Sequence, residues 1–439
     1  MSSSRAGVAL PSRRERVPVT CRLVLRGGRL ADGSAADVAV DARLGTITAV
    51  GPSLVAAPGD VVEPCAGMVI LAAPAEPHAH LDKALSAERP GAPSNPVGDL
   101  AGAVAAWRAQ WPLLTHDDIV DRATRAVDAM VLRGTTAIRT HVDVGHPLGL
   151  RAVRALVEVR AQVDKSGLAD LQLVALIAPP LSGTGGAASL RLLDEALDLG
   201  VDVVGGCPYA DPDPSAATAA ALATAGRWGV PVDLHTDETL AEGVLTVAEL
   251  ARLVIERGPG AGVTASHCVS LGVQPPDRQA ATAEALAAAG VGVVALPQTN
   301  LFLQARGRTT AAPRGLTALR PLLDAGVTVA AGADNVRDPF CSLGRFDATE
   351  TAALMVLAGH LSVEEAWQAC TTGSRLVMGL PPVAVAPGEP AELVAIEGET
   401  LSGAVAVGSE RRVTVHRGRV VARSSVSRAL IPAFEMMEV

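Results

Sequence analysis

Residues 171–205 have the sequence LQLVALIAPPLSGTGGAASLRLLDEALDLGVDVVG. A short apolar run opens this stretch at Leu171–Ala178, and a second one closes it at Val201–Gly205. Between them, Ser189–Leu199 has the apolar spacing of a helix. A strand, a helix and a second strand in this order predict a βαβ unit whose two strands are parallel.

The same alternation extends along most of the chain, from the second apolar run onward at a spacing of about 30 to 36 residues. The runs that predict barrel strands are Met68–Ala73, Ala137–Val142, Leu171–Ala178, Val201–Gly205, Val230–Leu234, Gly262–Ala265, Val291–Leu296 and Val327–Ala331. The helix-like stretches between them are Asp118–Arg133, Leu150–Ser166, Ser189–Leu199, Ser215–Trp228, Thr246–Arg257, Asp277–Ala289 and Ala318–Ala325. Eight such units predict an α/β protein with a (β/α)8 TIM-type barrel, whose functional site lies at the C-terminal ends of the strands. A doubly wound open sheet is disfavoured, because no GxGxxG turn follows an early strand.

Both ends of the chain have a different texture, with short alternating strands and Gly or Asp turns. The N-terminal part contains CRLVLRGGRL, ADVAVD and GTITAVG, and the C-terminal part contains AELVAIEG, GAVAVG and RRVTVHRGRVV. These segments predict one small β-sandwich domain that is formed by both termini.

The predicted organisation therefore has a barrel inserted into this sandwich, with additional helices at residues 346–381 after the last barrel strand. The sandwich is expected to comprise residues 19–72 and 382–424, and the barrel residues 73–381. Residues 1–18 and 425–439 are expected to be tails.

Composition excludes several classes of protein. The chain has 439 residues, 49% of them hydrophobic, and a net charge of −9, without the basic stripe of a nucleic-acid-binding protein. No apolar run approaches the ~18 residues of a membrane span, and no apolar block follows the N-terminal arginines as in a secretory signal. The six cysteines form no CxxC pair, which favours a reducing cytoplasm over a disulfide scaffold. Assembly into a homo-oligomer remains open.

Two histidines directly follow the first predicted barrel run, in Glu76-Pro-His78-Ala-His80. Residues i and i+2 of a strand point to the same side, so His78 and His80 can direct two imidazoles at one point inside the barrel mouth. Such a pair is suited to a divalent metal such as zinc or iron. An isolated HxH is more often a pair of surface histidines, and the position at a strand end is what favours a metal site.

Further polar residues follow later strands. His235-Thr-Asp-Glu238 follows the fifth run, where His235 can be a third ligand and Glu238 can exchange protons with water. His267 follows the sixth run, and its alternative role is that of a buried structural histidine. Asp334 follows the eighth run as a candidate metal ligand and proton acceptor, against the alternative of a helix N-cap.

Taken in this order, the residues resemble the metal site of the amidohydrolase superfamily. The local sequences are most similar to cytosine deaminase and its relatives, including enzymes that remove alkylamines from triazine rings. The similar stretches are Glu76–Asp82, Arg139–Val144, Asp202–Gly205, His235–Glu238, Val263–His267, Asn300–Gly307 and Asp334–Pro339. The resemblance extends from about residue 20 to residue 423.

The resemblance implies one divalent metal per chain, zinc or iron, held by His78, His80, His235 and Asp334. It also implies that Glu238 shuttles protons, that His267 polarises the water or the substrate, and that Asp334 accepts a proton from the water. A metal lowers the pKa of its bound water toward neutrality. The resulting hydroxide would add to a C=N carbon, Glu238 would protonate a ring nitrogen, and ammonia or an amine would leave.

Alternatives remain for the metal count and for the reaction. Two-metal members of the superfamily typically bridge their metals with a carboxylated lysine on the fourth strand, where this chain has Gly206-Cys-Pro-Tyr209. One metal is therefore favoured, although Cys207 keeps a bridged pair open. An amidase or cyclic-amide hydrolase on the same scaffold would turn over without releasing ammonia. A non-catalytic scaffold protein is disfavoured by the complete set of ligands.

The expected substrate is a small amino-substituted N-heterocycle or cyclic amidine. In cytosine deaminases a glutamine after the third strand recognises the pyrimidine, whereas Ile177-Ala-Pro-Pro-Leu-Ser182 contains none, so cytosine itself is disfavoured. Lys83 indicates an anionic or carbonyl group on the substrate. The expected substrate-binding residues are Leu81, Lys83, Tyr209, Gln298, Asn300, Asn335, Asp338 and Phe340.

Overall fold

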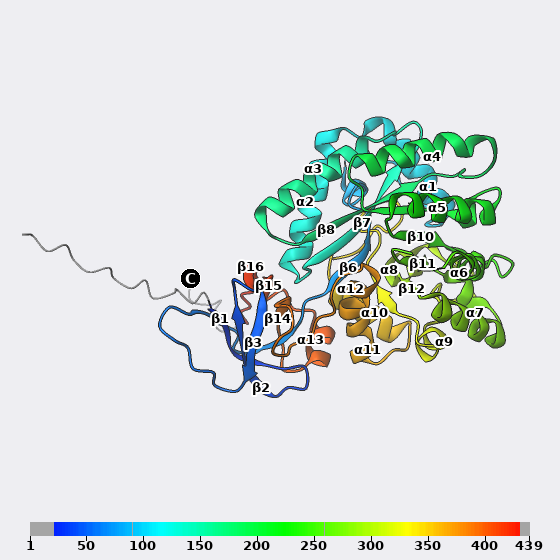
Figure 1. Cartoon of the computed structure of the whole chain (residues 1–439). Coiled ribbons are helices and arrows are strands. Elements are labelled where there is room, and N and C mark those ends of the chain that lie inside the picture. The colour runs from blue at the N-terminus through cyan, green and yellow to red at the C-terminus, as the bar shows by residue number, and fades with distance from the viewer. Residues whose placement is uncertain (1–21, 90, 259, 431–439) are drawn as a thin grey trace, which may run out of the picture.

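The computed structural model describes residues 22–430 except residues 90 and 259. These residues form a barrel and a smaller sheet domain that lies beside it (Figure 1). The predicted tail of residues 1–18 lies outside the described residues, as do residues 431–439 of the second predicted tail. Residues 425–430 have no helix or strand. Among the described residues, no helix combines the length and the apolar character needed to cross a membrane.

The barrel consists of eight parallel strands that are neighbours in chain order. They are β6 (Ala75–Ala79), β7 (Ala137–Val144), β8 (Asp170–Ile177), β9 (Val203–Gly206), β10 (Val232–Thr236), β11 (Val263–His267), β12 (Val291–Ala295) and β13 (Val329–Ala331). The sheet closes where Ala79 forms a parallel bridge with Asp334, just beyond β13. This arrangement confirms the predicted (β/α)8 barrel.

Helices connect the strands and cover the outside of the barrel (Figure 1). They are α1 (Leu100–Gln110), α2 (His116–Leu132), α3 (Arg151–Ser166), α4 (Gly183–Asp198), α5 (Pro214–Trp228), α6 (Thr246–Arg257), α7 (Pro276–Ala289), α8 (Pro297–Leu303), α9 (Leu319–Asp324), α10 (Ala348–Leu357), α11 (Val363–Gln368) and α12 (Ser374–Val377). Helix α5 shows why the sequence specifies these bounds. The Asp213 carboxylate accepts the Ala216 N–H, Pro214 occupies the first turn, and Gly229 ends the helix at φ 67°.

The first barrel strand is not the apolar run that predicted it. Residues Met68–Ala72 form β5, which pairs antiparallel with β14 (Leu393–Glu397) in the smaller sheet. The barrel starts with β6, whose sequence AEPHA is short, polar and interrupted by a proline. Pro77 has no N–H to donate, and the pairing of β6 with β7 shifts register between Glu76 and Ala79. A strand of this kind carries no apolar pattern.

Both termini contribute strands to the smaller sheet, as predicted. Its strands are β1 (Arg22–Arg29), β2 (Ala35–Asp41), β3 (Thr46–Gly51), β4 (Val61–Pro64), β5, β14, β15 (Arg412–His416) and β16 (Arg419–Ser424). The segment GAVAVG was wrongly predicted to be a strand. It lies in helix α13 (Leu401–Val407), where the Thr400 hydroxyl accepts the Gly403 N–H and Gly408 ends the helix in the left-handed conformation.

The two domains are joined by buried polar contacts. The Arg412 guanidinium donates two hydrogen bonds, of 2.9 and 2.7 Å, to the two carboxylate oxygens of Asp347, which caps α10. The Thr414 hydroxyl donates to the Val131 carbonyl at 2.8 Å, near the end of α2. Strand β15 is therefore fastened to the barrel helices α2 and α10.

Candidate active site

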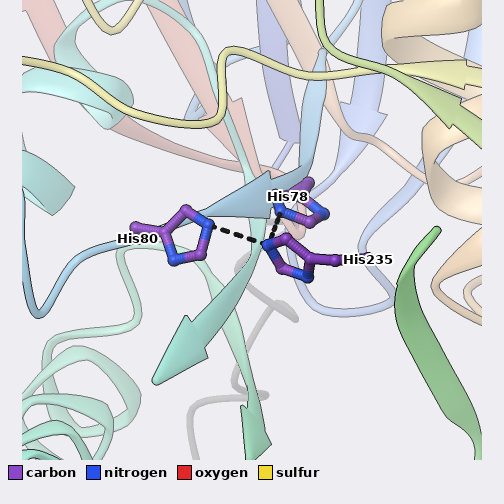
Figure 2. A group of neighbouring side chains, drawn as sticks. All are labelled: His78, His80 and His235. Carbon is purple, nitrogen blue, oxygen red and sulfur yellow. Dashed lines mark hydrogen bonds between the residues drawn. The ribbon is translucent and has the colours of Figure 1, made fainter. Parts of the chain in front are cut away.

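Three imidazoles meet at the C-terminal end of the barrel (Figure 2). His78 lies on β6, His80 directly follows this strand, and His235 lies on β10. The Nε2 atom of His235 is 3.2 Å from that of His78 and 3.3 Å from that of His80. The two strand positions of His78 and His80 therefore direct their rings to one point, as the spacing of two residues predicts.

Asp334 lies just beyond β13, where the barrel closes against β6, and its carboxylate reaches the same point. Its Oδ1 atom is 3.1 Å from His80 Nε2 and 3.7 Å from His78 Nε2. Its backbone N–H donates to the His78 carbonyl at 3.0 Å, which fixes the loop after β13 against β6. Asp334 has φ 64°, a left-handed conformation that few non-glycine residues adopt. The fold thus holds this carboxylate in place at a cost in backbone energy.

Neutral histidines and a carboxyl whose charge lacks compensation fit a divalent cation. Burial, followed by repulsion from neighbouring histidines and Lys83, lowers the pKa of His78, His80 and His235 well below the usual value, which leaves neutral imidazoles with free lone pairs. Burial and the nearby Glu238 carboxyl raise the pKa of Asp334 well above its usual value. Neither Asp334 side-chain oxygen has a hydrogen-bond partner among the described residues. A cation at this point would satisfy the carboxylate and the three nitrogens together, a donor set that suits zinc or iron.

A second carboxyl, that of Glu238, lies beside this cluster. Its Oε2 atom accepts a hydrogen bond from the Tyr209 hydroxyl at 3.3 Å, and its Oε1 atom is 3.8 Å from His267 Nδ1. Burial raises the pKa of Glu238, while His267 and the Tyr209 hydrogen bond act in the opposite direction. A buried carboxyl of this kind can both accept and return a proton.

His267 lies on β11, between the two carboxyls. Its Nε2 atom is 4.0 Å from Asp334 Oδ2, and its Nδ1 atom is 3.1 Å from Asn300 Oδ1. The Asn300 oxygen only accepts, so His267 Nδ1 carries a hydrogen and Nε2 faces the cluster. His267 and Cys268 have φ values of 70° and 49°, so the chain turns sharply where β11 ends.

The cluster opens into a cavity of about 300 Å³. Helix α1 covers one side with Leu100, Val104 and Trp107, and the residues after β8 form another side with apolar and proline side chains. The charged and polar side chains of the lining include those of His80, Lys83, Arg108, Asp143, Tyr209, His235, Glu238, His267, Asp334 and Asn335. Such a concave site with mostly apolar walls and a few convergent polar groups is typical of a small-molecule site.

Lys83 is held within this lining and is almost fully buried. Its ammonium group donates to Asp143 Oδ1 at 2.7 Å and lies 3.1 Å from His80 Nδ1. Burial alone would lower the pKa of Lys83, but the carboxylates of Asp143 and Asp82 outweigh it and raise the pKa. Lys83 is therefore a fixed positive charge next to the cavity.

Four of the residues expected to bind substrate do not line the cavity. Leu81 is fully buried, and its N–H donates to the Thr140 hydroxyl. The Gln298 amide donates to Thr351 Oγ1 at 2.7 Å. Asn300 holds His267, as described above. Asp338 accepts the N–H groups of Phe340 and Cys341 and thus shapes the loop that carries Phe340 into the cavity wall. Each position lies near a strand end, but its side chain is used to hold a loop or the core.

Sequence reasoning also missed residues of the cavity. Asp143 lies two residues after His141 on β7, so a spacing of two would have placed it at the same strand end. Trp107 lies on α1, whose sequence LAGAVAAWRAQ has no distinct apolar stripe to identify a helix that faces a cavity. The Trp107 indole N–H donates to Asp143 Oδ2 at 2.6 Å, which connects the two elements.

The fold and the cluster define a barrel protein equipped for metal-dependent hydrolysis. Residues 151–422 match the amidohydrolase family. The chain is 35% identical over 360 residues to the pterin deaminase of Rhizobium rhizogenes, and the alignment covers 80% of each protein. The chain therefore belongs to the amidohydrolase family. The matched stretch contains His235, Glu238, His267 and Asp334.

Solved structures show the same architecture. The 5-methylcytosine deaminase of Klebsiella pneumoniae superposes with a TM-score of 0.82 at 26% identity, over 94% of this chain and 100% of that one. The N-isopropylammelide isopropylaminohydrolase of Burkholderia multivorans gives a TM-score of 0.78 at 30% identity, over 92% and 98% of the two chains. These similarities cover both the barrel and the smaller sheet domain.

Proposed function

We propose that this protein is a metal-dependent hydrolytic deaminase of an amino-substituted N-heterocycle. The observation that carries the proposal is the juxtaposition of three neutral imidazoles, the Asp334 carboxylate and the Glu238 carboxyl at one end of a cavity. The deaminases among the relatives support the reaction class.

The metal ligands in this proposal are His78, His80, His235 and Asp334. A bound divalent cation would lower the pKa of a water molecule toward neutrality and so provide a nucleophile at physiological pH. The ligand set suits zinc and iron alike, and elemental analysis distinguishes them. We place one metal here. Cys207, the candidate bridge, also lines the cavity, but it belongs to none of the groups of described residues whose ligand atoms lie close enough together to hold a metal ion.

Residues around the histidine cluster carry out the proton transfers. Glu238 accepts a proton from the attacking water and delivers it to a ring nitrogen or to the departing amine. Tyr209 holds the Glu238 carboxyl through its hydroxyl hydrogen bond. His267 directs its Nε2 atom to the same space, and Asn300 fixes this orientation. The apolar side of α1 keeps bulk water away from these groups.

We infer that the substrate is a flat heterocycle of the pterin type. The 35% identical relative is named for pterin, and the aromatic rings of Trp107 and Phe340 contribute to the cavity wall, as planar substrates require. The stretch Ile177–Ser182, which begins at the last residue of β8, places Pro179 in the cavity wall where a polar residue would recognise a pyrimidine. This composition disfavours cytosine.

The test combines elemental analysis with an ammonia-release assay on pterin, 5-methylcytosine, cytosine and N-isopropylammelide, the last also assayed for isopropylamine. We expect about one zinc or iron per chain and release of ammonia from pterin. Glu238→Gln should retain the metal and lose at least about 100-fold in kcat, the usual scale of general acid–base catalysis. Glu284→Gln, an exposed change on α7, is the matched control and should behave as wild type.

Two outcomes would contradict the proposal. Purified wild-type protein without a transition metal, and unable to bind one, would remove the basis of the chemistry. Turnover of a cyclic amide without release of ammonia or amine would instead assign the site to amide hydrolysis.

A further inference from the structure

A chain of buried polar side chains lies beneath the histidine cluster. The four residues come from four barrel strands: His78 from β6, Arg139 from β7, Asp233 from β10 and Ser266 from β11. All four have 0% exposure. His78 Nδ1 is 2.9 Å from Ser266 Oγ, Ser266 Oγ is 2.8 Å from Asp233 Oδ1, and the Arg139 guanidinium is 3.0 Å from Asp233 Oδ2.

The donor and acceptor of each of these hydrogen bonds can be assigned in turn, starting at Arg139 and ending at His78. Arg139 only donates, and the Asp233 carboxylate only accepts. The Ser266 hydroxyl has one hydrogen, and this hydrogen is given to Asp233 Oδ1. Ser266 Oγ can then only accept from His78, so the hydrogen of the neutral His78 ring is on Nδ1. The Nε2 lone pair consequently points to the cluster that it shares with His235.

His78 is also held against rotation. The His141 ring stacks on it with centroids 3.8 Å apart and planes inclined by 27°. The other two imidazoles lack an equivalent hydrogen-bond acceptor. His235 Nδ1 has no partner among the residues that the structure describes, and His80 Nδ1 faces the Lys83 ammonium, which only donates. Among these three imidazoles, the fold therefore favours a lone pair on the Nε2 that faces the cluster for His78 alone, whereas the Lys83 contact favours hydrogen on Nε2 of a neutral His80.

We propose that Arg139, Asp233 and Ser266 form a positioning relay that selects the metal-binding tautomer of His78. The relay rests on the metal site proposed above, and it assigns a role to residues that touch neither metal nor substrate. Partners of this kind orient metal-binding histidines in other proteins, and their loss typically weakens metal binding about 10- to 100-fold.

The same residues admit one competing interpretation. His78, His141 and Asp233 also lie close enough to hold a second cation. The Arg139 guanidinium already neutralises Asp233 at 3.0 Å, and a divalent ion beside it would face a buried positive charge. A stoichiometry of two tightly bound Zn²⁺ ions, with the second lost in Asp233→Asn, would overturn the relay in favour of that site.

Asp233→Asn gives the sharpest test. The Asn oxygen must face Arg139, which only donates, so the Asn NH₂ group must face Ser266. The Ser266 hydrogen then turns to His78 Nδ1, and the ring hydrogen moves to Nε2. Asp233→Asn should therefore weaken binding of Zn²⁺ by more than Ser266→Ala, because in Ser266→Ala the His78 ring can still adopt either tautomer. Ser266→Thr retains the hydroxyl and should rescue binding.

Zn²⁺ affinity of metal-stripped, full-length protein is measured by competition with a chromophoric chelator. We expect Ser266→Ala to weaken binding about 10- to 100-fold. Ser270→Ala is the matched control, because Ser270 is equally buried and its hydroxyl has no partner among the described residues. Thermal melting confirms that each variant is folded. Zn²⁺ affinity as in wild type for both Asp233→Asn and Ser266→Ala would overturn the relay.

A second readout separates this inference from the proposed function. Imidazole ¹⁵N–¹H spectra of the metal-free protein report the tautomer, with the His78 signals assigned by their loss in His78→Gln. We expect hydrogen on Nδ1 in wild type and on Nε2 in Asp233→Asn. Hydrogen on Nε2 in wild type would overturn the relay. Failure of wild type to bind any transition metal would overturn the proposed function and leave the tautomer result standing.

Discussion

At the scale of single residues, burial changes which site groups carry protons. The histidines of the cluster are neutral because a charged imidazole is poorly solvated inside the barrel. The same loss of solvation raises the pKa of Glu238. These opposite effects on bases and acids leave lone pairs at the proposed metal site and a carboxyl beside it with a raised pKa, as suits a group that accepts and returns a proton.

Tyr209 adjusts this balance, and its removal should move the pH profile. The Tyr209 hydroxyl donates to Glu238 and lowers the pKa of that carboxyl. Glu238 must be ionised to accept a proton, so activity is lost as the pH falls through its pKa. In Tyr209→Phe the pKa of Glu238 rises further, and we expect the acid limb of kcat/KM to move to higher pH.

The measurement is kcat/KM against pH for the substrate found in the ammonia assay. Phe340→Leu is the control. It alters the cavity wall, but Phe340 is not among the residues that shift the pKa of Glu238 through charge or hydrogen bonding. An acid limb at the same pH in Tyr209→Phe and wild type would show that this hydrogen bond does not tune the proton shuttle.

The sequence predicted the positions of the site residues better than their contacts. The spacing of His78 and His80 and the strand-end positions of His235, His267 and Asp334 follow from local pattern, and the structure brings all five together. Asn300 was expected to touch substrate, yet its partner His267 lies 33 residues away. Only the three-dimensional packing of α8 against β11 determines that contact.

At the scale of elements, helix α1 forms one wall of the site. It lies over the cavity, and the hydrogen bond from the Trp107 indole to Asp143 fastens it to β7. Asp143 also accepts from Lys83 at 2.7 Å. The helix, the strand and the buried lysine are therefore joined through one carboxylate.

Trp107→Phe should loosen α1, because it removes one charge-assisted hydrogen bond and keeps most of the ring. We expect amide hydrogen exchange of residues 100–110 to accelerate about 10-fold, the equivalent of ~1.4 kcal/mol. Trp111→Phe is the matched control, because the Trp111 indole nitrogen has no partner among the described residues. Equal exchange in both variants would exclude the proposed fastening of α1.

The local sequence pattern predicted the elements that have an apolar stripe of their own. It did not predict the elements whose structure depends on the neighbouring elements that they pack against. Helices α2, α3 and α6 match the predicted stretches closely, because their buried residues recur at helical spacing. Strand β6 was missed because barrel closure, and not apolar content, makes it a strand. Helix α13 was mistaken for a strand because its Ala and Val residues suit either state, and packing against α10 and α11 favours the helix.

At the scale of the whole molecule, the sequence indicated that both termini build one domain but not how that domain is attached. Arg412 lies in an alternating strand pattern, where a charged residue is expected to face solvent. It is instead 1% exposed, because its partner Asp347 lies 65 residues earlier at the start of α10. No local sequence pattern predicts an ion pair between residues so far apart in the sequence.

Disruption of this buried ion pair should cause one of the largest losses in the free energy of unfolding that a single substitution can produce. Arg412→Met keeps the aliphatic stem but leaves the Asp347 carboxylate buried. Its remaining partners among the described residues are the more distant Arg133 cation at 3.3 Å and the neutral Thr349 donors. Removal of one partner from a buried ion pair typically costs about 3–5 kcal/mol, because the other charge is left without compensation. We expect a loss of this size in the free energy of unfolding, measured by urea titration at pH 7. Arg320→Ala is the control, because its ion pair with Glu365 is exposed to solvent and should contribute little. Similar unfolding curves for Arg412→Met and Arg320→Ala would mean that this buried ion pair contributes little to the attachment of the smaller sheet domain to the barrel.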